Sequence, residues 1–483
     1  LNFTTKTKPA VTKALYDFIV PTDGDFKAAL AAAAKRTDTS KRFRIFIKQG
    51  DYKIPADESS KVTGSDGNSY ANPTTYMNTP NVSIIGEGMN NTSLTNTVPS
   101  SGQAANVLEG IGKGDVLCLQ KGATNTYFQD LKMYSSMGDN KGRDIVLNDQ
   151  SNKTICKNVN LWAYQDTYVS NNQNGKFYFE NGILRGRTDF LCGKGDVYYN
   201  NVELWFCEKG GYLAVPSQSK KYGYIFKDCT IKDATAAKDL NGNYTLGRPW
   251  GKGTPIALYI DTKMEAIPSA AGWSEMSGGY PKRFAEYNSY TSTGSVVDLK
   301  DRKKVYDAYD SKDGDNYVNR RNETTESPIL TAEEAAFFTV ENIMGQDDDW
   351  DPTAATEQAS APTNVKLNGT TLTWDNNDYA LLWAICKNGK VVNFTITPSY
   401  IVDDASATWG VRAANEMGGL SEATTIGQGT GIRNITSATE AAVIKTAIYA
   451  ADGTQLSNLQ KGINIIVKTL ADGSKKTSKV IVK

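Results

Sequence analysis

The chain has 483 residues, more than one ordinary domain, and its 53 basic and 53 acidic side chains give zero formal net charge. This balance gives no support for nucleic-acid binding, and no apolar run reaches the roughly 18 residues of a membrane-spanning helix. Because the chain contains no histidine, Ser-His-Asp and Cys-His catalysis and histidine-ligated metal sites are excluded. The start at Leu1 lacks a basic and then apolar leader, so we expect a processed, soluble chain.

The first predicted elements are a short strand, a turn and a helix. Residues 18–36 read FIVPTDGDFKAALAAAAKR, in which Asp25 stands at the N-cap position of an amphipathic helix. Such a helix would cover the open end of a repeat structure. Strands punctuated by glycine turns are predicted at residues 42–54 and 81–88.

Five strand-like segments then share one pattern, in which alternating apolar residues flank a single Asn or Asp. These polar residues are Asp130, Asn158, Asn181, Asn201 and Asp228, with successive spacings of 28, 23, 20 and 27. A repeat of this length with a period of two predicts a solenoid with one coil per repeat. The aromatic residues two positions before the polar residue are expected to stack inside; they are Phe128, Phe179, Tyr199 and Phe226.

Two further aspartates occupy the same position in adjacent repeats. Asp166 lies 8 residues after Asn158, and Asp189 lies 8 residues after Asn181. Because neighbouring strands lie about 4.8 Å apart, this register predicts two carboxylates roughly 5 Å from each other. The same count gives Gly138 and Lys209 in the flanking repeats, so only the middle two coils carry the acid pair.

The remaining chain suggests additional modules. A helix is predicted after Thr331, at the end of a first domain covering residues 1–352. Residues 353–363 have the Ala, Thr and Pro composition of a linker. Short strands and turns in residues 364–430 predict a small β-sandwich that resembles a fibronectin type III module. Residues 431–483 form predicted hairpins and resemble the C-terminal β modules that secreted bacterial proteins carry for sorting or surface attachment.

Three ordered motifs surround the acid pair. They are Gln165-Asp166-Thr167, Asp189-Phe190-Leu191-Cys192-Gly193 and Leu246-Gly247-Arg248-Pro249-Trp250. These segments resemble the QDT, DFIFG and LGRPW hallmarks of the pectin methylesterase (pectinesterase) family. The resemblance covers roughly residues 15–352 and implies a right-handed parallel β-helix there. With the N-terminal capping helix and the sandwich modules predicted above, the expected fold is all-β.

The resemblance also implies roles for individual residues. Asp189 would be the nucleophile that attacks a methyl-esterified galacturonate, and Asp166 the general acid and base. Arg248 would hold Asp189 charged, and Gln165 would donate a hydrogen bond to the oxyanion. Sugar contacts would come from aromatic side chains, for which the candidates are Trp250, Trp273, Tyr168 and Phe190; burial in the core is the alternative for Trp250 and Trp273.

The chain departs from the family pattern at two positions beside these motifs. Where the family places a second oxyanion glutamine, 22 residues before Gln165, this chain has Arg143. Arginine can also donate to an oxyanion, or its charge can perturb the aspartates. Cys192 replaces an aromatic residue of the second motif, and we expect it to fill a small packing position.

The sequence leaves three alternatives to pectin demethylation open. A carboxylate pair about 5 Å apart also suits a retaining glycoside hydrolase acting on polygalacturonan. A pectate lyase is disfavoured because no cluster of acidic calcium ligands is evident. Arg143 and the appended modules would also fit a weakly active, pectin-binding surface protein. For the leading hypothesis we expect a metal-free and cofactor-free monomer that binds pectin (homogalacturonan) and is secreted, periplasmic or attached to a bacterial cell surface.

Overall fold

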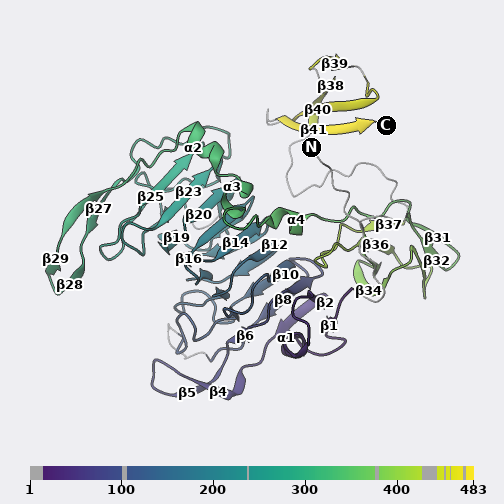
Figure 1. Ribbon diagram of the computed structural model, residues 1–483, viewed down its shortest axis with the longest axis horizontal. Coiled ribbons are helices and arrows are strands. Elements are labelled where there is room, and N and C mark those ends of the chain that lie inside the picture. Colours follow the sequence, from purple (N-terminus) through teal and green to yellow (C-terminus); the bar gives the residue numbers. More distant parts are fainter. Residues whose placement is uncertain are drawn as a thin grey trace. The chain divides into compact units, whose positions relative to one another are not determined.

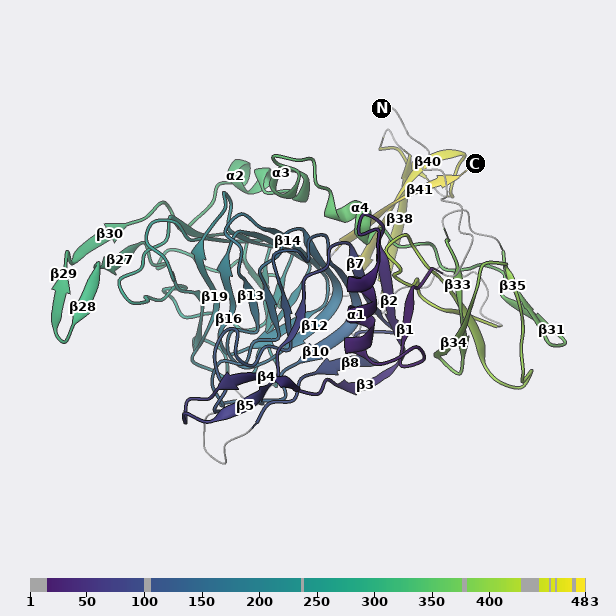
Figure 2. The ribbon, with the colours of Figure 1, turned by 60° about the horizontal axis from the view of Figure 1, so that its bottom comes forward.

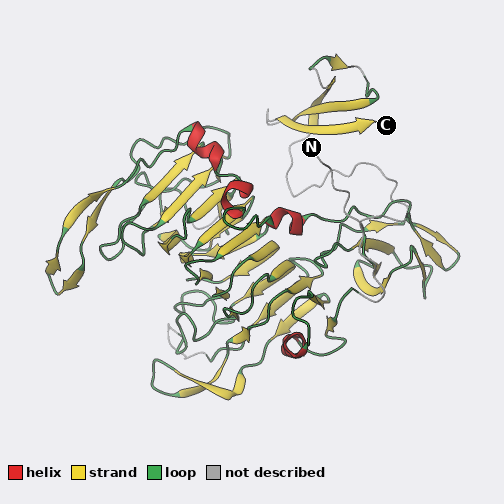
Figure 3. Ribbon diagram, in the orientation of Figure 1, coloured by secondary structure: helices red, strands yellow, loops and turns green. Residues whose placement is uncertain are grey.

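Parallel β-strands stacked as successive coils form the main body of the protein (Figure 1, Figure 3). The computed structural model describes residues 15–99, 106–235, 239–375, 380–426, 443–450, 453–456, 458–470 and 475–482. The coils contribute strands to three parallel faces, and apolar side chains between these faces form the core. The expected all-β, parallel β-helix architecture is confirmed.

Two of the three faces are joined through β10 and β12, which bend and belong to both. The first face contains β1 (Phe18–Val20), β2 (Phe43–Ile47), β7 (Val82–Gly86), β10 (Tyr127–Tyr134), β12 (Thr154–Trp162), β14 (Lys176–Glu180), β17 (Asp196–Asn200), β20 (Tyr224–Lys227), β23 (Ile256–Ile260) and β25 (Arg283–Tyr287). The second adds β3 (Gly50–Lys53), β8 (Thr92–Thr95), β15 (Ile183–Gly186), β18 (Glu203–Phe206), β21 (Thr230–Asp233), β24 (Lys263–Met264) and β26 (Tyr290–Thr291). The third contains β6 (Thr75–Met77), β9 (Leu117–Leu119), β11 (Leu147–Asp149), β13 (Tyr168–Ser170), β16 (Thr188–Lys194), β19 (Gly211–Gln218) and β22 (Tyr244–Gly247).

A residue with left-handed backbone conformation marks the bend between the first two faces in each predicted repeat. The bend residues are Asp130 (φ 57°), Asn158 (49°), Asn181 (57°), Asn201 (54°) and Asp228 (55°). Asn and Asp adopt this conformation more readily than other non-glycine residues, which explains why the repeat carries them. Adjacent bends are also linked, since Asn158 Nδ2 donates to Asp130 Oδ1 at 3.0 Å. The series continues in two later coils at Asp261 and Asn288.

The aromatic residues before the bends stack inside the coils, as predicted. Phe179 lies 5.1 Å from Tyr199, which lies 4.6 Å from Phe226, measured between ring centroids. Tyr259 extends the stack at 4.3 Å from Phe226. Phe128 is also fully buried in the same core. This interior ladder fixes the register of successive coils.

Helix α1 (Phe26–Lys35) lies at the β1 and β2 end of the coils (Figure 2). Asp25 caps it, because its side chain accepts the Ala28 N–H at 2.8 Å. The helix buries Phe26 and Leu30 in the core of the β-helix. The predicted capping helix is therefore present.

The segment after Thr331 forms two short helices where one was predicted. Thr331 and Glu334 form a capping box at α2 (Ala332–Phe337), and Thr339 caps α3 (Val340–Met344). A further helix, α4 (Pro352–Thr356), occupies most of the first half of the expected linker. Three antiparallel pairs lie outside the coils, namely β4 (Asp57–Thr63) with β5 (Ser69–Asn72), β27 (Val305–Ala308) with β30 (Arg321–Thr324), and β28 (Ser311–Asp313) with β29 (Asn316–Val318).

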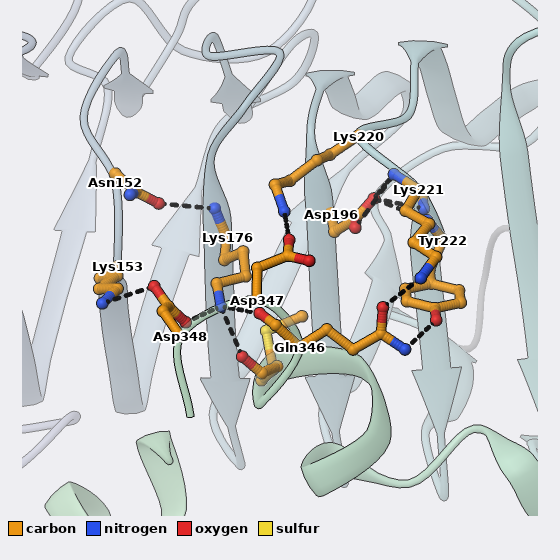
Figure 4. Close-up of polar contacts among 12 residues, drawn as sticks. Asn152, Lys153, Lys176, Asp196, Lys220, Lys221, Tyr222, Gln346, Asp347 and Asp348 are labelled. Carbon is orange, nitrogen blue, oxygen red and sulfur yellow. Dashed lines mark hydrogen bonds and ion pairs between the residues drawn. The ribbon is translucent and has the colours of Figure 1, made fainter. Parts of the chain in front are cut away.

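The acidic residues between α3 and α4 bind lysines from several coils (Figure 4). Asp348 pairs with Lys153 at 2.8 Å and also with Lys176, and Asp347 pairs with Lys220. The Lys176 side chain is only 4% exposed, and it also donates to the Met344 carbonyl at 2.7 Å. These ion pairs therefore hold the segment between α3 and α4 against the β-helix.

Residues 364–426 form two antiparallel sheets around their own apolar core, consistent with the expected sandwich. One sheet contains β31 (Lys366–Asn368), β32 (Thr371–Thr373) and β35 (Ser399–Ile401); the other contains β33 (Trp383–Lys387), β34 (Lys390–Thr395), β36 (Trp409–Ala413) and β37 (Thr424–Thr425). Phe394 packs on Tyr16 and Phe46 of the β-helix at centroid distances of 4.9 and 5.2 Å. Arg412 Nη1 donates to the Glu87 carbonyl at 3.0 Å. The sandwich and the coils thus form one compact unit up to residue 427.

A second compact unit begins at residue 428. Its antiparallel sheet contains β38 (Val443–Ala450), β39 (Gln455–Leu456), β40 (Gly462–Leu470) and β41 (Lys475–Val482). The predicted boundary at residues 430 and 431 lies outside the described residues. Among the described residues, no helix combines the length and apolar character needed to cross a membrane.

Candidate active site

Asp166 and Asp189 occupy equivalent positions on adjacent coils. Tyr168 of β13 pairs with Leu191 of β16. Asp166 lies two residues before Tyr168, and Asp189 lies two residues before Leu191. Both aspartates adopt left-handed backbone conformations, with φ of 59° and 52°, and both are 5% exposed. The stacking of two coils therefore sets the relationship between these carboxyl groups.

The two aspartates line a cavity of about 240 Å³ on the outside of the third face. Six residues singled out in the sequence meet there, namely Arg143, Gln165, Asp166, Asp189, Arg248 and Trp250. They come from segments up to 107 residues apart, so the fold brings them together. The cavity thus combines two carboxyl groups, two guanidinium groups, an amide and an indole.

Arg248 holds Asp189 through two parallel hydrogen bonds. Nε donates to Oδ1 at 2.9 Å and Nη2 to Oδ2 at 2.6 Å. The guanidinium also lies 3.9 Å above the ring of Tyr212, which the sequence did not single out. Burial raises the pKa of Asp189, and the paired guanidinium opposes this rise. The fork orients the carboxylate and favours its ionised form.

Among the described residues, no cation forms such a fork with Asp166, whose environment favours the protonated form. Burial and the neighbouring charge of Asp189 raise its pKa to about 7, although Arg143 and a hydrogen bond from Cys192 act in the opposite direction. Cys192 is buried beneath the cavity, and burial raises the pKa of its thiol well above the usual value. One carboxyl can therefore be charged while the other carries a proton near neutral pH.

Arg143 lines the cavity in an ion pair with Glu109. Its Nε donates to Glu109 Oε2 at 2.9 Å, and Nη2 donates to Oε1 at 3.1 Å. The Arg143 side chain is 46% exposed, so the pair lies at the rim. Glu109 carries no recognisable sequence signal, because it belongs to a loop 34 residues before its partner.

A third buried carboxyl group supports the turn that carries Asp166. Asp144 is 1% exposed, and its Oδ1 accepts the backbone N–H groups of Tyr164 at 3.0 Å and Gln165 at 2.8 Å. Burial raises the pKa of Asp144 well above its usual value. Its proximity to Arg143 in the sequence was the only signal that could have indicated this role.

The four aromatic candidates separate into one surface residue and three core residues. Trp250 is 46% exposed and lines the cavity. Trp273 is 1% exposed between Tyr259 and Phe284, so the core alternative describes it. Tyr168 and Phe190 are fully buried in the same core, and neither offers a ring face to a sugar, contrary to expectation. Among these four, Trp250 is therefore the one that is exposed and lines the cavity.

The comparisons with known proteins agree with this arrangement. A family model described as pectinesterase matches residues 17–344. Pectinesterase 1 of Solanum lycopersicum is 22% identical over 295 residues, covering 58% of this chain and 48% of that protein. Pectinesterase 2 of Citrus sinensis is 24% identical over 323 residues, covering 63% and 57%. The chain spans about half the length of such relatives.

Solved structures show the same fold at low sequence identity. Pectin methylesterase from carrot is 17% identical with a TM-score of 0.53, covering 73% of this chain and 99% of that chain. The pectin methylesterase from Aspergillus niger is 16% identical with a TM-score of 0.50, covering 72% and 100%. Since the family model matches more than half of the sequence, this chain belongs to the pectinesterase family.

Proposed function

We propose that the protein is a pectin methylesterase, which hydrolyses the methyl esters of homogalacturonan to pectate and methanol. The observation that carries this proposal is the division of protonation between two adjacent carboxyl groups. Arg248 favours a charged Asp189, while burial and Asp189 raise the pKa of Asp166 to about 7. An ester hydrolase without histidine needs this pairing of a nucleophile with a proton donor.

In the first half-reaction, a carboxylate oxygen of Asp189 attacks the carbonyl carbon of the ester. The carbonyl electrons move onto oxygen, and the resulting oxyanion accepts a hydrogen bond from the Gln165 amide, with Arg143 as a second available donor. When the tetrahedral intermediate collapses, the bond to the methoxy oxygen breaks and Asp166 gives its proton to that oxygen. Methanol leaves, and an acyl-enzyme anhydride with Asp189 remains.

In the second half-reaction, the now charged Asp166 removes a proton from water. The hydroxide attacks the substrate carbonyl of the anhydride, and the bond to the Asp189 oxygen breaks. Asp189 regains its carboxylate, Asp166 regains its proton, and the galacturonate leaves as an acid. Trp250 would hold the sugar ring at the mouth of the cavity, where its exposed indole offers an apolar face.

The decisive assay follows methanol release from highly methylated pectin by the parent and by Asp189→Asn. We expect release by the parent and a near-complete loss in the variant. New reducing ends without methanol would instead support a glycoside hydrolase, and ultraviolet-absorbing unsaturated products would support a lyase. Polymer binding without turnover, unchanged by Asp189→Asn, would support the surface-binding alternative.

We further propose that the protein acts outside the cytoplasm as a monomer, with residues 431–483 serving in sorting or attachment to a bacterial surface. Its polymeric substrate lies in plant cell walls, which supports this placement. Fractionation of the producing cells should find the full chain in the medium, the periplasm or the outer surface. A chain found only in the cytoplasm would contradict this part of the proposal.

A further inference from the structure

A row of aromatic and cationic side chains crosses the second face of the β-helix. Strand pairing places its members opposite one another on five consecutive coils; they are Tyr134, Trp162, Arg185, Trp205 and Lys232. All five are partly exposed, whereas the adjacent inward residues are buried in the core. The sequence pattern alone did not indicate this row.

Lys132, two residues before Tyr134, adds a third cation to the row. Its Nζ lies 3.7 Å above the ring of Trp162 and 5.1 Å from that of Tyr134. Among the residues that the structure describes, no carboxylate forms an ion pair with Lys132. Burial and the neighbouring Arg185 lower the pKa of Lys132, whereas the charge of Asp51 acts in the opposite direction.

The other two cations have carboxylate partners that solvent can reach. Arg185 holds Asp139 through two hydrogen bonds, from Nη1 to Oδ1 at 2.8 Å and from Nη2 to Oδ2 at 2.7 Å, and Nη1 also donates to the Ala163 carbonyl at 3.0 Å. Lys232 pairs with Glu203 at 2.7 Å. The Asp139 and Glu203 side chains are 43% and 42% exposed. The single ion pair between Lys232 and Glu203 contributes little to stability, so a ligand carboxylate can compete for Lys232.

The indoles connect the cations into one surface. Trp162 and Trp205 lie 6.0 Å apart, and Lys232 lies 4.6 Å above Trp205. The Trp162 Nε1 group is buried and has no hydrogen-bond partner. A tryptophan between cations can bind a sugar that bears a negative charge, because the indole offers apolar contact and the cations attract the charge.

The spacing of the cations fits a polymer that carries a carboxylate on every sugar. Arg185 and Lys232 come from β15 and β21, which are two strands apart, so their backbones are separated by about 10 Å. In an extended uronic acid chain of nearly two-fold symmetry, every second sugar turns its carboxylate to the same side. Arg185 and Lys232 would then each lie beside one carboxylate, and Trp205 would lie beside the intervening sugar.

The row is also close to the candidate active site along the chain. Trp162 lies four residues before Asp166, and Arg185 lies four residues before Asp189. Both segments pass directly from the second face into the cavity. A polymer held on this row would therefore remain beside the site after its esters had been removed.

We propose that this row, with Lys132, is a second binding surface for de-esterified galacturonan, separate from the catalytic cavity. The choice of galacturonan as the ligand rests on the proposed function. Its ligand is the polyanionic product of that reaction, and its effect is to keep the enzyme on a chain that it has begun to demethylate. Affinity for polygalacturonate should fall with salt and should require oligomers of about five sugars, to span five coils.

The first test measures binding of polygalacturonate to the full-length protein by calorimetry. Lys132→Ala and Trp162→Ala should each weaken binding at least tenfold. Lys263→Ala is the matched control, because Lys263 belongs to β24 of the same face but pairs with Glu265 outside the row. Its affinity should equal that of the parent.

A variant that strengthens binding provides a further test, because loss of folding would weaken binding and could not produce this effect. Glu203→Gln frees Lys232 and removes a negative charge, so it should bind polygalacturonate several times more tightly. Melting temperatures identify any variant that fails to fold. The surface is refuted if Lys132→Ala binds like Lys263→Ala, or if Glu203→Gln binds no better than the parent.

Methanol release from a short methylated trigalacturonate separates this inference from the proposed function. Such a substrate reaches the cavity but cannot span the row, so Lys132→Ala should have the same kcat/KM as the parent for the trigalacturonate. For partly methylated polymer, Lys132→Ala should have a higher KM than the parent. Failure of the parent to release methanol would contradict the esterase proposal. Unaltered polygalacturonate binding in Lys132→Ala and Trp162→Ala would contradict the second surface instead.

Discussion

Arg248 holds Asp189 with two parallel hydrogen bonds, whereas no cation in the described part of the chain forms such a fork with Asp166 on the adjacent coil. This asymmetry separates two carboxyl groups that would otherwise titrate as a symmetric pair. The division of labour between nucleophile and acid thus depends on a residue contributed 59 positions after Asp189.

Replacing the Arg248 guanidinium with a single ammonium should show how much the two parallel hydrogen bonds contribute to activity. We expect Arg248→Lys to fold but to lose activity on the order of 10²-fold, because one point charge cannot orient both carboxylate oxygens. Since Arg248 lowers the pKa of Asp189, the acidic limb of the pH profile of kcat/KM should move to higher pH. An unshifted limb would show that Asp189 is not the group that must ionise.

The alkaline limb should report Asp166, whose pKa is about 7. Asp166 must carry a proton to protonate methoxide, so kcat/KM should fall as the pH rises through about 7. Arg143 lowers this pKa and Glu109 raises it. Arg143→Gln should therefore remain active and move the limb to higher pH, whereas Glu109→Gln should move it to lower pH. Abolished turnover in Arg143→Gln would instead make Arg143 the essential oxyanion donor.

Two tryptophans offer a matched comparison of binding and packing. Trp250→Ala should raise KM about tenfold with a small change in stability, because a half-exposed indole at the cavity contributes mainly sugar contact. Trp273→Ala should lower the free energy of unfolding by about 3–5 kcal/mol, since this indole is buried in the core. Michaelis kinetics and denaturant unfolding together distinguish the two effects.

The acidic segment between α3 and α4 should stabilise the β-helix through charge. Asp348→Asn removes the partner of the buried Lys176, and we expect a loss of about 1–3 kcal/mol in the free energy of unfolding. Asp349→Asn is the control, because Asp349 is exposed and its left-handed backbone conformation is one that Asn tolerates. Equal stability of the two variants in urea would show that the lysine contacts contribute nothing.

The repeat pattern predicted the bends because Asn and Asp are needed there for a local backbone reason. Asp261 and Asn288 follow the same rule, but the longer spacing of 33 residues after Asp228 concealed them. The count of eight residues placed Asp166 and Asp189 correctly relative to each other. The same count failed at Gly138 and Lys209, because loops of unequal length precede β11 and β19. The pairing of Leu147 with Tyr168 puts Ile145, not Gly138, level with Asp166. On the other side, Tyr212 pairs with Thr188, the residue before Asp189.

The rest of the site depends on tertiary contacts that spacing does not encode. Glu109 reaches Arg143 from a loop, and Asp144 reaches the backbone of Gln165 across a coil. The sequence could not show whether Trp273 is buried or exposed, because Trp273 lies in the irregular segment after β24, which has no alternating pattern. The docking of the sandwich was equally hidden, since composition suggested a flexible connection where α4 lies.

Asp166 and Asp189 both lie at left-handed backbone positions, where Asn is as well suited as Asp. The codons of these two amino acids differ by one base. A single point mutation can therefore abolish the chemistry while leaving the coil intact, and the reverse mutation can restore it. Relatives that keep this architecture but carry Asn at either corner would be natural candidates for non-catalytic carbohydrate-binding proteins.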